Sequence, residues 1–289
     1  MEQKQSQKTD RFQLMAAPLQ GYTLSDFRNA HRKSCGGADV YFAPFLRLEK
    51  GLVRKKELAD LRRDLEVESR GITVPQLMVK SPEELAVFVE TIRQENVLRE
   101  SFHFPPFQWI DLNFGCPFPK MTEHGYGAGI LAEEDCVKKL LCSLKKYPDF
   151  HFSVKMRAGM HCRDDWKKLV GFLIDADLEL VVFHGRTGDQ GYDGEADWTL
   201  CLNFAECYGG RVVYNGDIRT LEQVRFLREK IPHLCGIMAG RGLLANPLLF
   251  LEIRENGKRY LQERIQHLEQ YTTYFLEEVS RRTDQVLPE

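Results

Sequence analysis

Residues 211–240 have the sequence RVVYNGDIRTLEQVRFLREKIPHLCGIMAG, in which two short apolar runs flank a charged, helical segment. Apolar runs of this length bounded by glycine or asparagine are typical of buried strands. Thr220 belongs to the residue types that cap helix N-termini, and it directly precedes the helical segment. The stretch therefore predicts a strand, a helix and a second strand parallel to the first, which is the unit of an α/β fold.

Similar apolar runs recur along the whole chain at a fairly even spacing. In order they are FQLMAAP, DVYFAPF, TVPQLMV, QWIDLNF, HFSVKMR, LELVVFHG, RVVYNGD and LCGIMAG. Helical segments separate them, such as SPEELAVFVETIRQ after Lys80 and EEDCVKKLLCSLKK after Ala132, with Ser81 and Glu133 at their starts. Eight strands, each followed by a helix, within about 250 residues predict a (β/α)₈ TIM barrel. An open doubly wound sheet is the alternative, but no G-x-G-x-x-G fingerprint follows the first strand.

The chain is predicted to divide at residue 250. Residues 1–250 would form the barrel, and residues 251–289 would form a short C-terminal helical extension. The extension carries apolar residues at alternating spacings of four and three, which predicts one helix with a single apolar stripe packed on the barrel. The stripe consists of Leu261, Ile265, Leu268, Thr272, Phe275 and Val279.

Composition excludes several classes of protein. Of the 289 residues, 28% are charged, but the formal net charge is only −2, so no global basic field would bind nucleic acid non-specifically. Any RNA contact would have to come from local patches. No apolar run approaches the length of a membrane span, and the N-terminal residues MEQKQSQKTDRFQ contain no apolar segment of a secretion signal.

The cysteines indicate a reducing compartment. Eight are present, with no C-x-x-C pair and no spacing typical of zinc ligands. We therefore expect a cytoplasmic protein with no metal site, and a monomer, although no sequence pattern argues for the monomer. Five cysteines are predicted to be small buried side chains: Cys35, Cys136, Cys142, Cys201 and Cys235.

Polar residues and glycines follow the predicted strands at the ends where a barrel carries its chemistry. The set consists of Pro18, Gln76, Asn113, Cys116, Lys155, His184, Arg186, Asn215, Gly216, Asp217, Gly240 and Arg241. The glycines of NGD and GRG follow the last two strands, where barrels bring backbone N–H groups against a phosphate. A phosphorylated ligand is therefore expected.

Two residues of this set indicate what else the ligand carries. Lys155 lies between apolar residues in FSVKMR, and a lysine that points into a barrel mouth needs an anionic partner to offset its desolvation. The amide of Gln76 offers donors and an acceptor, which suits the edge of an imide ring. A phosphate site, an amide and a cation together favour FMN, with Lys155 near the flavin N1/O2 edge.

Six motifs resemble, in order, those of the dihydrouridine synthases, the flavin enzymes that reduce uridine in transfer RNA. They are MAAPLQGYT, DLNFGCPFPK with the following GYGAG, SVKMR, VVFHGRTGDQGY, NGDI and GIMAGRGLLANP. An ordered series is far more specific than any single motif. The resemblance implies a barrel that holds FMN, accepts electrons from NADPH or NADH, and passes hydride to C6 of a uracil ring in RNA, most often tRNA.

The resemblance also implies roles for single residues. Cys116 would donate the proton to C5 of uracil, from a thiol that an ordinary pKa of about 8.5 keeps protonated at pH 7. Asn113 would shape the uracil pocket, and the GYGAG segment is expected to be a mobile loop that brings Cys116 over the substrate. Lys120 and Arg186 are the candidates for RNA contact. Cofactor contacts would come from Pro18 and Leu19 through their backbone, from Gln76 and Lys155 at the ring edge, and from His184, Asn215, Gly216, Asp217, Gly240 and Arg241 near the phosphate.

The chain departs from the family pattern near the barrel mouth. Glu123 and His124 stand where the family usually has a basic pair, and Gly188 and Asp189 stand where a basic residue is common. The C-terminal helical region is also shorter than is usual in the family. These differences leave the flavin chemistry in place and weaken the choice of RNA as substrate.

Two other functions stay open at this point. The first is an FMN-dependent reductase of a small enone or pyrimidine, which activity on free uridine or a cyclic enone would favour. The second is a non-catalytic protein that binds RNA or flavin. The combination of Cys116 with Lys155 argues against the second alternative.

Overall fold

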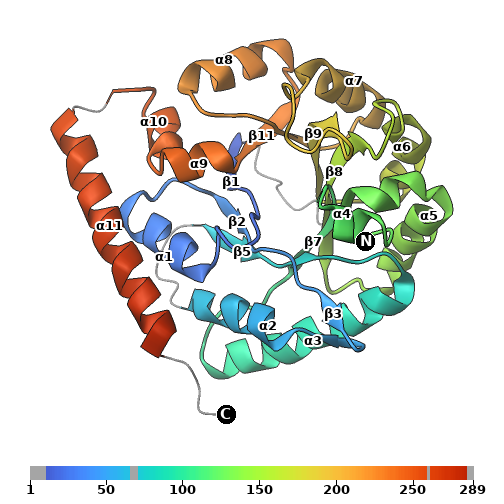
Figure 1. Cartoon of the computed structure of the whole chain (residues 1–289), viewed down its shortest axis with the longest axis horizontal. Helices are drawn as coiled ribbons and strands as arrows, with labels where there is room; N and C mark the ends of the chain where they lie inside the picture. The colour runs from blue at the N-terminus through green and yellow to red at the C-terminus, as the bar shows by residue number, and fades with distance from the viewer. Residues whose placement is uncertain (1–10, 66–70, 259–260, 285–289) are drawn as a thin grey trace, which may run out of the picture.

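Nine parallel strands form one sheet that curves around a common axis, with helices on its outer side (Figure 1). This computed structural model describes residues 11–65, 71–258 and 261–284. The strand order is β5-β2-β1-β11-β10-β9-β8-β7-β6. The strands are β1 (Gln13–Ala16), β2 (Val40–Phe42), β5 (Ile72–Val74), β6 (Gln76–Leu77), β7 (Trp109–Phe114), β8 (His151–Gly159), β9 (Leu180–Thr187), β10 (Val212–Asn215) and β11 (Leu234–Ala239).

Helices connect the strands as the barrel prediction requires. They are α1 (Ser25–Ser34), α2 (Lys55–Arg62), α3 (Pro82–Ser101), α4 (Pro119–Thr122), α5 (Glu134–Ser143), α6 (Trp166–Asp175), α7 (Trp198–Tyr208), α8 (Leu221–Lys230), α9 (Arg241–Ala245), α10 (Leu249–Arg254) and α11 (Leu261–Asp284). Short 3₁₀ helices occur at Arg63–Leu65, Gly127–Ala132 and Leu144–Lys146, and β3 (Leu48–Glu49) pairs with β4 (Leu52–Val53) in a hairpin. Ser81 and Thr220 cap α3 and α8 through their side chains, as predicted.

All eight predicted strands are present, and the third one closes the barrel. Pro75 divides it, since proline has no N–H to donate to a neighbouring strand. On one side of Pro75, β5 pairs with β2, and on the other side β6 pairs with β7. The carbonyl oxygen of Pro75 accepts a hydrogen bond of 3.0 Å from Asp111 N. The TIM barrel is therefore confirmed, and the open doubly wound sheet is wrong.

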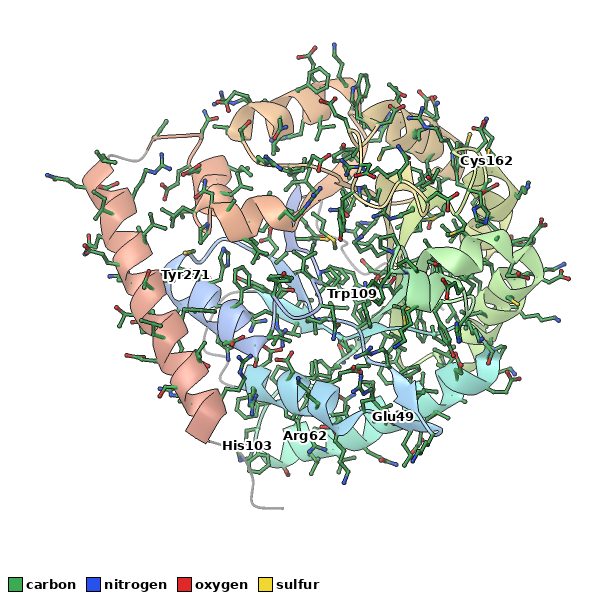
Figure 2. All side chains as sticks on the ribbon, in the orientation of Figure 1. Glu49, Arg62, His103, Trp109, Cys162 and Tyr271 are labelled. Carbon is green, nitrogen blue, oxygen red and sulfur yellow. The ribbon has the colours of Figure 1, made fainter. Side chains whose placement is uncertain are left out.

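Apolar side chains fill the interior of the barrel toward the amino ends of its strands. Alternate residues of each strand face the axis, because side chains of a strand point to opposite sides in turn. The apolar members near the axis are Met15, Ala17, Val40, Phe42, Val74, Trp109, Leu180, Val182, Val213 and Met238. Figure 2 places Trp109 near the centre of the ring, whereas Glu49, Arg62 and Cys162 lie toward its edge. Further along the same strands the axis-facing positions become polar, and these positions form the floor of the site.

The C-terminal helix α11 packs along α1 at the side of the barrel and does not cover its mouth (Figure 1). The contact is mixed in character: Tyr271 meets Phe27 at a ring distance of 6.3 Å, and Arg282 forms an ion pair of 2.9 Å with Asp26. His267 Nδ1 lies 2.7 Å from the carbonyl oxygen of Ser34.

The predicted apolar stripe is therefore only partly the packing face of α11. Leu261, Ile265 and Leu268 are 38–72% exposed, while Phe275 is partly buried against the core. The reason is that α1 presents polar groups, which pair with the polar and aromatic face of α11 better than with an aliphatic stripe.

Two predictions about cysteines are wrong. Cys35 and Cys201 are buried, but Cys136 and Cys142 are exposed, because α5 turns Val137, Leu140 and Leu141 inward instead. Among the described residues, no helix has the length and apolar character needed to cross a bilayer, and no cluster of histidine, cysteine and carboxylate side chains could hold a metal ion.

Candidate active site

A cavity of about 520 Å³ opens at the carboxyl ends of the strands. Twelve of the fourteen predicted site residues line it, although they come from six different strand ends. They are Pro18, Leu19, Asn113, Cys116, Lys155, His184, Arg186, Asn215, Gly216, Asp217, Gly240 and Arg241. The other two lie nearby: Gln76 is fully buried beneath the floor, and Lys120 is exposed on α4 outside the cavity. The structure thus brings the predicted set together in one place.

Cys116 sits in a tightly held turn after β7. Asn113 Oδ1 accepts hydrogen bonds from the backbone N–H groups of Gly115 at 3.1 Å and Cys116 at 2.9 Å. The carbonyl oxygen of Cys116 accepts from Ala128 N at 2.9 Å. Burial raises the pKa of the thiol, against the opposing effects of the Phe118 N–H and the Lys155 charge. The side chain therefore stays a protonated thiol to higher pH than an ordinary cysteine.

The GYGAG segment, predicted to be a mobile loop, packs against this turn. Its residues from Gly127 onward are buried in a 3₁₀ helix. Gly127 has φ +59°, and a Cβ there would lie 2.5 Å from the carbonyl oxygen of Cys116. A Cβ on Gly129 would lie 2.4 Å from the carbonyl oxygen of Thr122. The glycines are needed because the two backbone segments touch, and the contact fixes Cys116.

Lys155 projects into the cavity from the middle of β8, next to Asn113 in the register of β7 and β8. Within the described part of the chain, no oxygen accepts a hydrogen bond from its ammonium group. Burial lowers the pKa of Lys155 to about 8, and the charge of Arg157 adds to this effect. An ammonium group in this position is stabilised by an anionic ligand.

Arg157 is a site residue that the sequence analysis missed. It is buried, and its guanidinium donates to the carbonyl oxygens of Gly115 at 2.9 Å and Thr187 at 2.7 Å. Burial lowers its pKa to about 10, so it remains charged at neutral pH. The signal was present in the sequence, since Ser153, Lys155 and Arg157 alternate along one strand. The predicted strand ended at residue 157, whereas β8 continues to residue 159.

Where β9, β10 and β11 end, one carboxylate holds two guanidinium groups. Asp217 accepts from Arg186 at 2.5 Å and from Arg241 at 2.7 Å. Burial alone would raise the pKa of Asp217, but the hydrogen bond and charge of Arg186 outweigh it and lower the pKa. Asp217 therefore orients the two arginines at the cavity wall.

The position of Arg186 changes its predicted role. Its side chain is 2% exposed and also donates to the carbonyl oxygen of Gly194 at 2.6 Å. A side chain this buried faces the cavity and pins the loop after β9. It does not lie on the outer surface, where an RNA backbone would be contacted.

The other predicted cofactor residues are held in defined orientations. Asn215 Nδ2 donates to the carbonyl oxygen of Met238 at 2.8 Å. Burial, together with the charges of Lys155 and Arg157, lowers the pKa of His184 well below its ordinary value, so the imidazole is neutral. In the turn after β1, the N–H of Leu19 donates to Thr23 Oγ1 at 2.8 Å. That N–H is thus already used within the chain.

Glycines allow the segments after β9, β10 and β11 to approach one another. A Cβ on Gly242 would lie 1.9 Å from the carbonyl oxygen of Ile218, and a Cβ on Gly216 would lie 2.5 Å from Cβ of Ala196. The close approach leaves the backbone of Gly240 and the side chain of Arg241 at the cavity wall.

Gly242→Ala is expected to destabilise the protein by about 1–3 kcal/mol, because backbone cannot rotate away from the new methyl group. Denaturant unfolding would measure the change. Gly171→Ala is the matched control: Gly171 lies in α6 with no atom within 4 Å of an added Cβ. That control should be neutral or stabilising by up to about 1 kcal/mol. Equal stability of the two variants would contradict the packing described here.

Aromatic side chains that the sequence analysis did not single out surround the opening. Tyr22, Phe118 and Tyr192 come from the loops after β1, β7 and β9, and each is exposed and lines the cavity. The guanidinium of Arg241 stacks 4.4 Å from the ring centre of Tyr192. Flat rings at the mouth of a pocket favour a flat ligand by stacking.

The barrel and its mouth define a (β/α)₈ protein with a cavity at the carboxyl ends of its strands, which cationic side chains line and aromatic rings surround. Lys155 enters the cavity from β8, and Arg186 with Arg241 lies at the β9–β11 end. A solved structure, that of N-(5'-phosphoribosyl)anthranilate isomerase from Pyrococcus furiosus, has the same fold, with a TM-score of 0.50 and 12% identity over 86% of this chain and 99% of that one.

The chain belongs to the dihydrouridine synthase (Dus) family, whose family model matches residues 15–287. A probable tRNA-dihydrouridine synthase of Aquifex aeolicus is 29% identical over 94% of this chain and 80% of its own length. The tRNA-dihydrouridine(16) synthase of Cupriavidus necator is 28% identical over 83% of this chain and 73% of its own. The resemblance stated from the motifs is therefore confirmed.

Proposed function

We propose that this protein reduces uridine to dihydrouridine in tRNA, with FMN as cofactor and NADPH or NADH as reductant. Family membership and the names of the relatives support the reaction and the RNA. The observation in this chain that supports the proposed reaction is the cavity itself, in which Asn113, Cys116 and Lys155 face one space at the barrel mouth.

The residues of the cavity fit FMN. The ammonium of Lys155, without a hydrogen-bond partner in the described residues, matches the flavin N1/O2 edge, where reduction develops negative charge. The guanidinium groups of Arg186 and Arg241, with the backbone at Gly216 and Gly240, match the phosphate. When bound, FMN would supply the hydride for C6 of uracil.

The chain itself would supply the proton. Addition of hydride at C6 leaves enolate-like negative charge at C5, and a general acid must deliver a proton there. Cys116 meets the requirements because it lines the cavity, is held by Asn113 and Ala128, and has a pKa raised by burial. A thiol that stays protonated at neutral pH is in the form that a proton donor needs.

The substrate uridine must leave its stack to reach this cavity, because a stacked base cannot enter a pocket at the bottom of a barrel mouth. The exposed rings of Tyr22, Phe118 and Tyr192 offer stacking surfaces for the displaced base or its neighbours. With a net charge of −2, the chain relies on local cations for the RNA backbone.

Lys120 is the predicted RNA contact that remains on the surface, beside Phe118 at the start of α4. Lys120→Ala is expected to weaken tRNA binding and to reduce the slope of log K against log salt by about one, because one phosphate contact is lost. Lys139→Ala, an exposed lysine on the outer helix α5, is the control and should leave the slope unchanged. Identical slopes for both variants would remove Lys120 from the RNA interface.

The proposed function is tested by the absorption spectrum of the purified protein and by mass spectrometry of tRNA incubated with it and NADPH. A flavin spectrum and a gain of two mass units on uridine are expected. A flavin protein that leaves tRNA unchanged but reduces a free pyrimidine or a cyclic enone would indicate the small-molecule reductase instead. A protein that cannot be loaded with FMN would contradict the flavin assignment itself.

A further inference from the structure

A chain of hydrogen bonds runs from a buried carboxylate to the backbone of Cys116. It starts at Asp111, which is fully buried in β7. Gln76 Nε2 donates to Asp111 Oδ2 at 2.7 Å, and Asn113 Nδ2 donates to Gln76 Oε1 at 2.7 Å. Asn113 Oδ1 then accepts from Cys116 N at 2.9 Å. The chain thus connects three strand positions beneath the cavity with the turn that carries the thiol.

Both ends of this chain set the direction of its bonds: at one end the backbone N–H groups of Gly115 and Cys116 can only donate to Asn113, and at the other end Asp111 accepts. An ionised carboxylate can only accept, whereas a side-chain amide can be turned so that either end donates. Asp111 therefore requires the NH₂ group of Gln76, which leaves the oxygen of Gln76 for Asn113. Asn113 must then give its NH₂ group to Gln76, which leaves its oxygen for the N–H of Cys116. Without Asp111 the NH₂ group of Gln76 would be buried without this acceptor, and the pair of amides would lose the group that anchors it beneath the turn.

The carboxylate is itself held in place from the other side. Ser153 Oγ donates to Asp111 Oδ1 at 2.5 Å, and Trp109 Nε1 donates to Ser153 Oγ at 2.8 Å. Burial raises the pKa of Asp111 to about 7, against the hydrogen bonds from Gln76 and Ser153 and the charge of Lys155, so the side chain is an ionised carboxylate above about pH 7. Asp111 is thus a fixed acceptor with its two oxygens assigned to different partners.

We propose that Asp111 is a positioning residue that acts through Gln76 and Asn113 to fix the Cys116 turn. As far as the reaction is concerned, the inference rests on the proposed function, in which Cys116 donates a proton. The link between Asp111 and the thiol does not depend on it. A second consequence follows for the cavity: since Asn113 uses its oxygen on backbone N–H groups, it can offer only its remaining N–H to a ligand, and so favours a carbonyl oxygen there.

Three variants separate the direction of the hydrogen bonds from charge and from burial. Asp111→Leu removes the acceptor. Asp111→Asn removes the charge but can keep the direction, because its amide oxygen can accept from Gln76 while its NH₂ group faces Ser153. Ser153→Ala removes the hydrogen bond on the other oxygen of Asp111 and leaves the path to Cys116 intact.

The first readout is the rate at which iodoacetamide alkylates Cys116 in the protein without RNA, followed peptide by peptide, with the exposed Cys136 and Cys142 as internal references. We expect Asp111→Leu to raise the Cys116 rate several-fold relative to the references, because the turn loses its anchor. Asp111→Asn and Ser153→Ala should match the unmodified protein. If Asp111→Leu does not fold, Asp111→Ser replaces it, since the shorter serine side chain lacks the second oxygen that accepts from Gln76 Nε2.

The second readout is turnover of tRNA by the FMN-loaded protein. Asp111→Leu should lower kcat by about 10²-fold, the cost of misplacing a reacting group by about 1 Å, while the KM for tRNA stays near its original value. Asp111→Asn should restore most of kcat. Unchanged alkylation and turnover in Asp111→Leu, or equal loss in Asp111→Asn, would overturn the inference. If the unmodified protein does not reduce uridine, the proposed function fails, and the alkylation rates still test the link.

Discussion

Cys116→Ala is expected to lower the rate of uridine reduction by about 10²–10⁴-fold, the usual contribution of a general acid. Hydride addition at C6 would then build charge at C5 with only water to protonate it. The variant should still bind FMN, and NADPH should still reduce the flavin, because neither step uses the thiol. Stopped-flow absorbance would follow flavin reduction, and mass spectrometry would follow dihydrouridine.

The matched control for this experiment is Cys142→Ala. Cys142 is an exposed thiol on α5, outside the cavity, so its removal should leave both rates unchanged. If Cys116→Ala keeps full turnover while the flavin is oxidised by tRNA at the normal rate, another group must protonate C5, and the role proposed for Cys116 is lost.

Lys155→Met is expected to have the second large effect. It should slow the reduction of the flavin and leave the proton donor of the reaction in place. The ammonium is the cation of the cavity floor that has no hydrogen-bond partner in the described residues, and its removal would leave negative charge of a reduced ring without a counter-charge. Loss of one such stabilising donor typically costs about 10²–10³-fold in rate. The rate of flavin reduction by NADPH and the flavin reduction potential would measure the loss. Normal values for both would place Lys155 outside the cofactor site.

The pH dependence gives a second test of Lys155. Because burial lowers its pKa to about 8, the ammonium is charged below that pH and neutral above it. Flavin reduction should therefore slow as the pH rises through about 8. Lys155→Arg, which stays charged at all accessible pH, should remove this decline even if its overall rate is lower. The thiol of Cys116 would not produce the same decline, since its pKa is raised above the ordinary value.

Several features of the site could be predicted from the sequence because they depend on where a residue stands relative to a predicted strand. Glycines after the last two strands, a lysine within an apolar run, and a cysteine between glycine and proline each occupy a position that the strand pattern fixes. Since parallel strands of a barrel end at one rim, residues far apart in the chain had to meet there. Twelve of the predicted residues do line one cavity.

Other features could not be predicted because they depend on partners from distant segments. The sequence does not show that Arg157 holds the carbonyl groups of Gly115 and Thr187, or that Arg186 is buried against Asp217. Nor does it show that the glycines after Cys116 form a packed support. The prediction that the apolar stripe forms the packing face of α11 was also only partly right, because the side of α11 that faces α1 depends on the polar groups of α1.

The sequence by itself therefore determined the barrel, the order of its motifs and the residues at its mouth, because side-chain alternation and strand spacing are local properties of the chain. Only the tertiary structure decided how those residues are oriented. Asp111, Gln76, Asn113 and Cys116 illustrate the difference. Three of the four were singled out from the sequence, yet the direction of the hydrogen bonds between them follows from an accepting carboxylate at one end and donating backbone N–H groups at the other. Orientation of this kind arises when groups from separate strands must satisfy one another away from water, and no single segment contains that information.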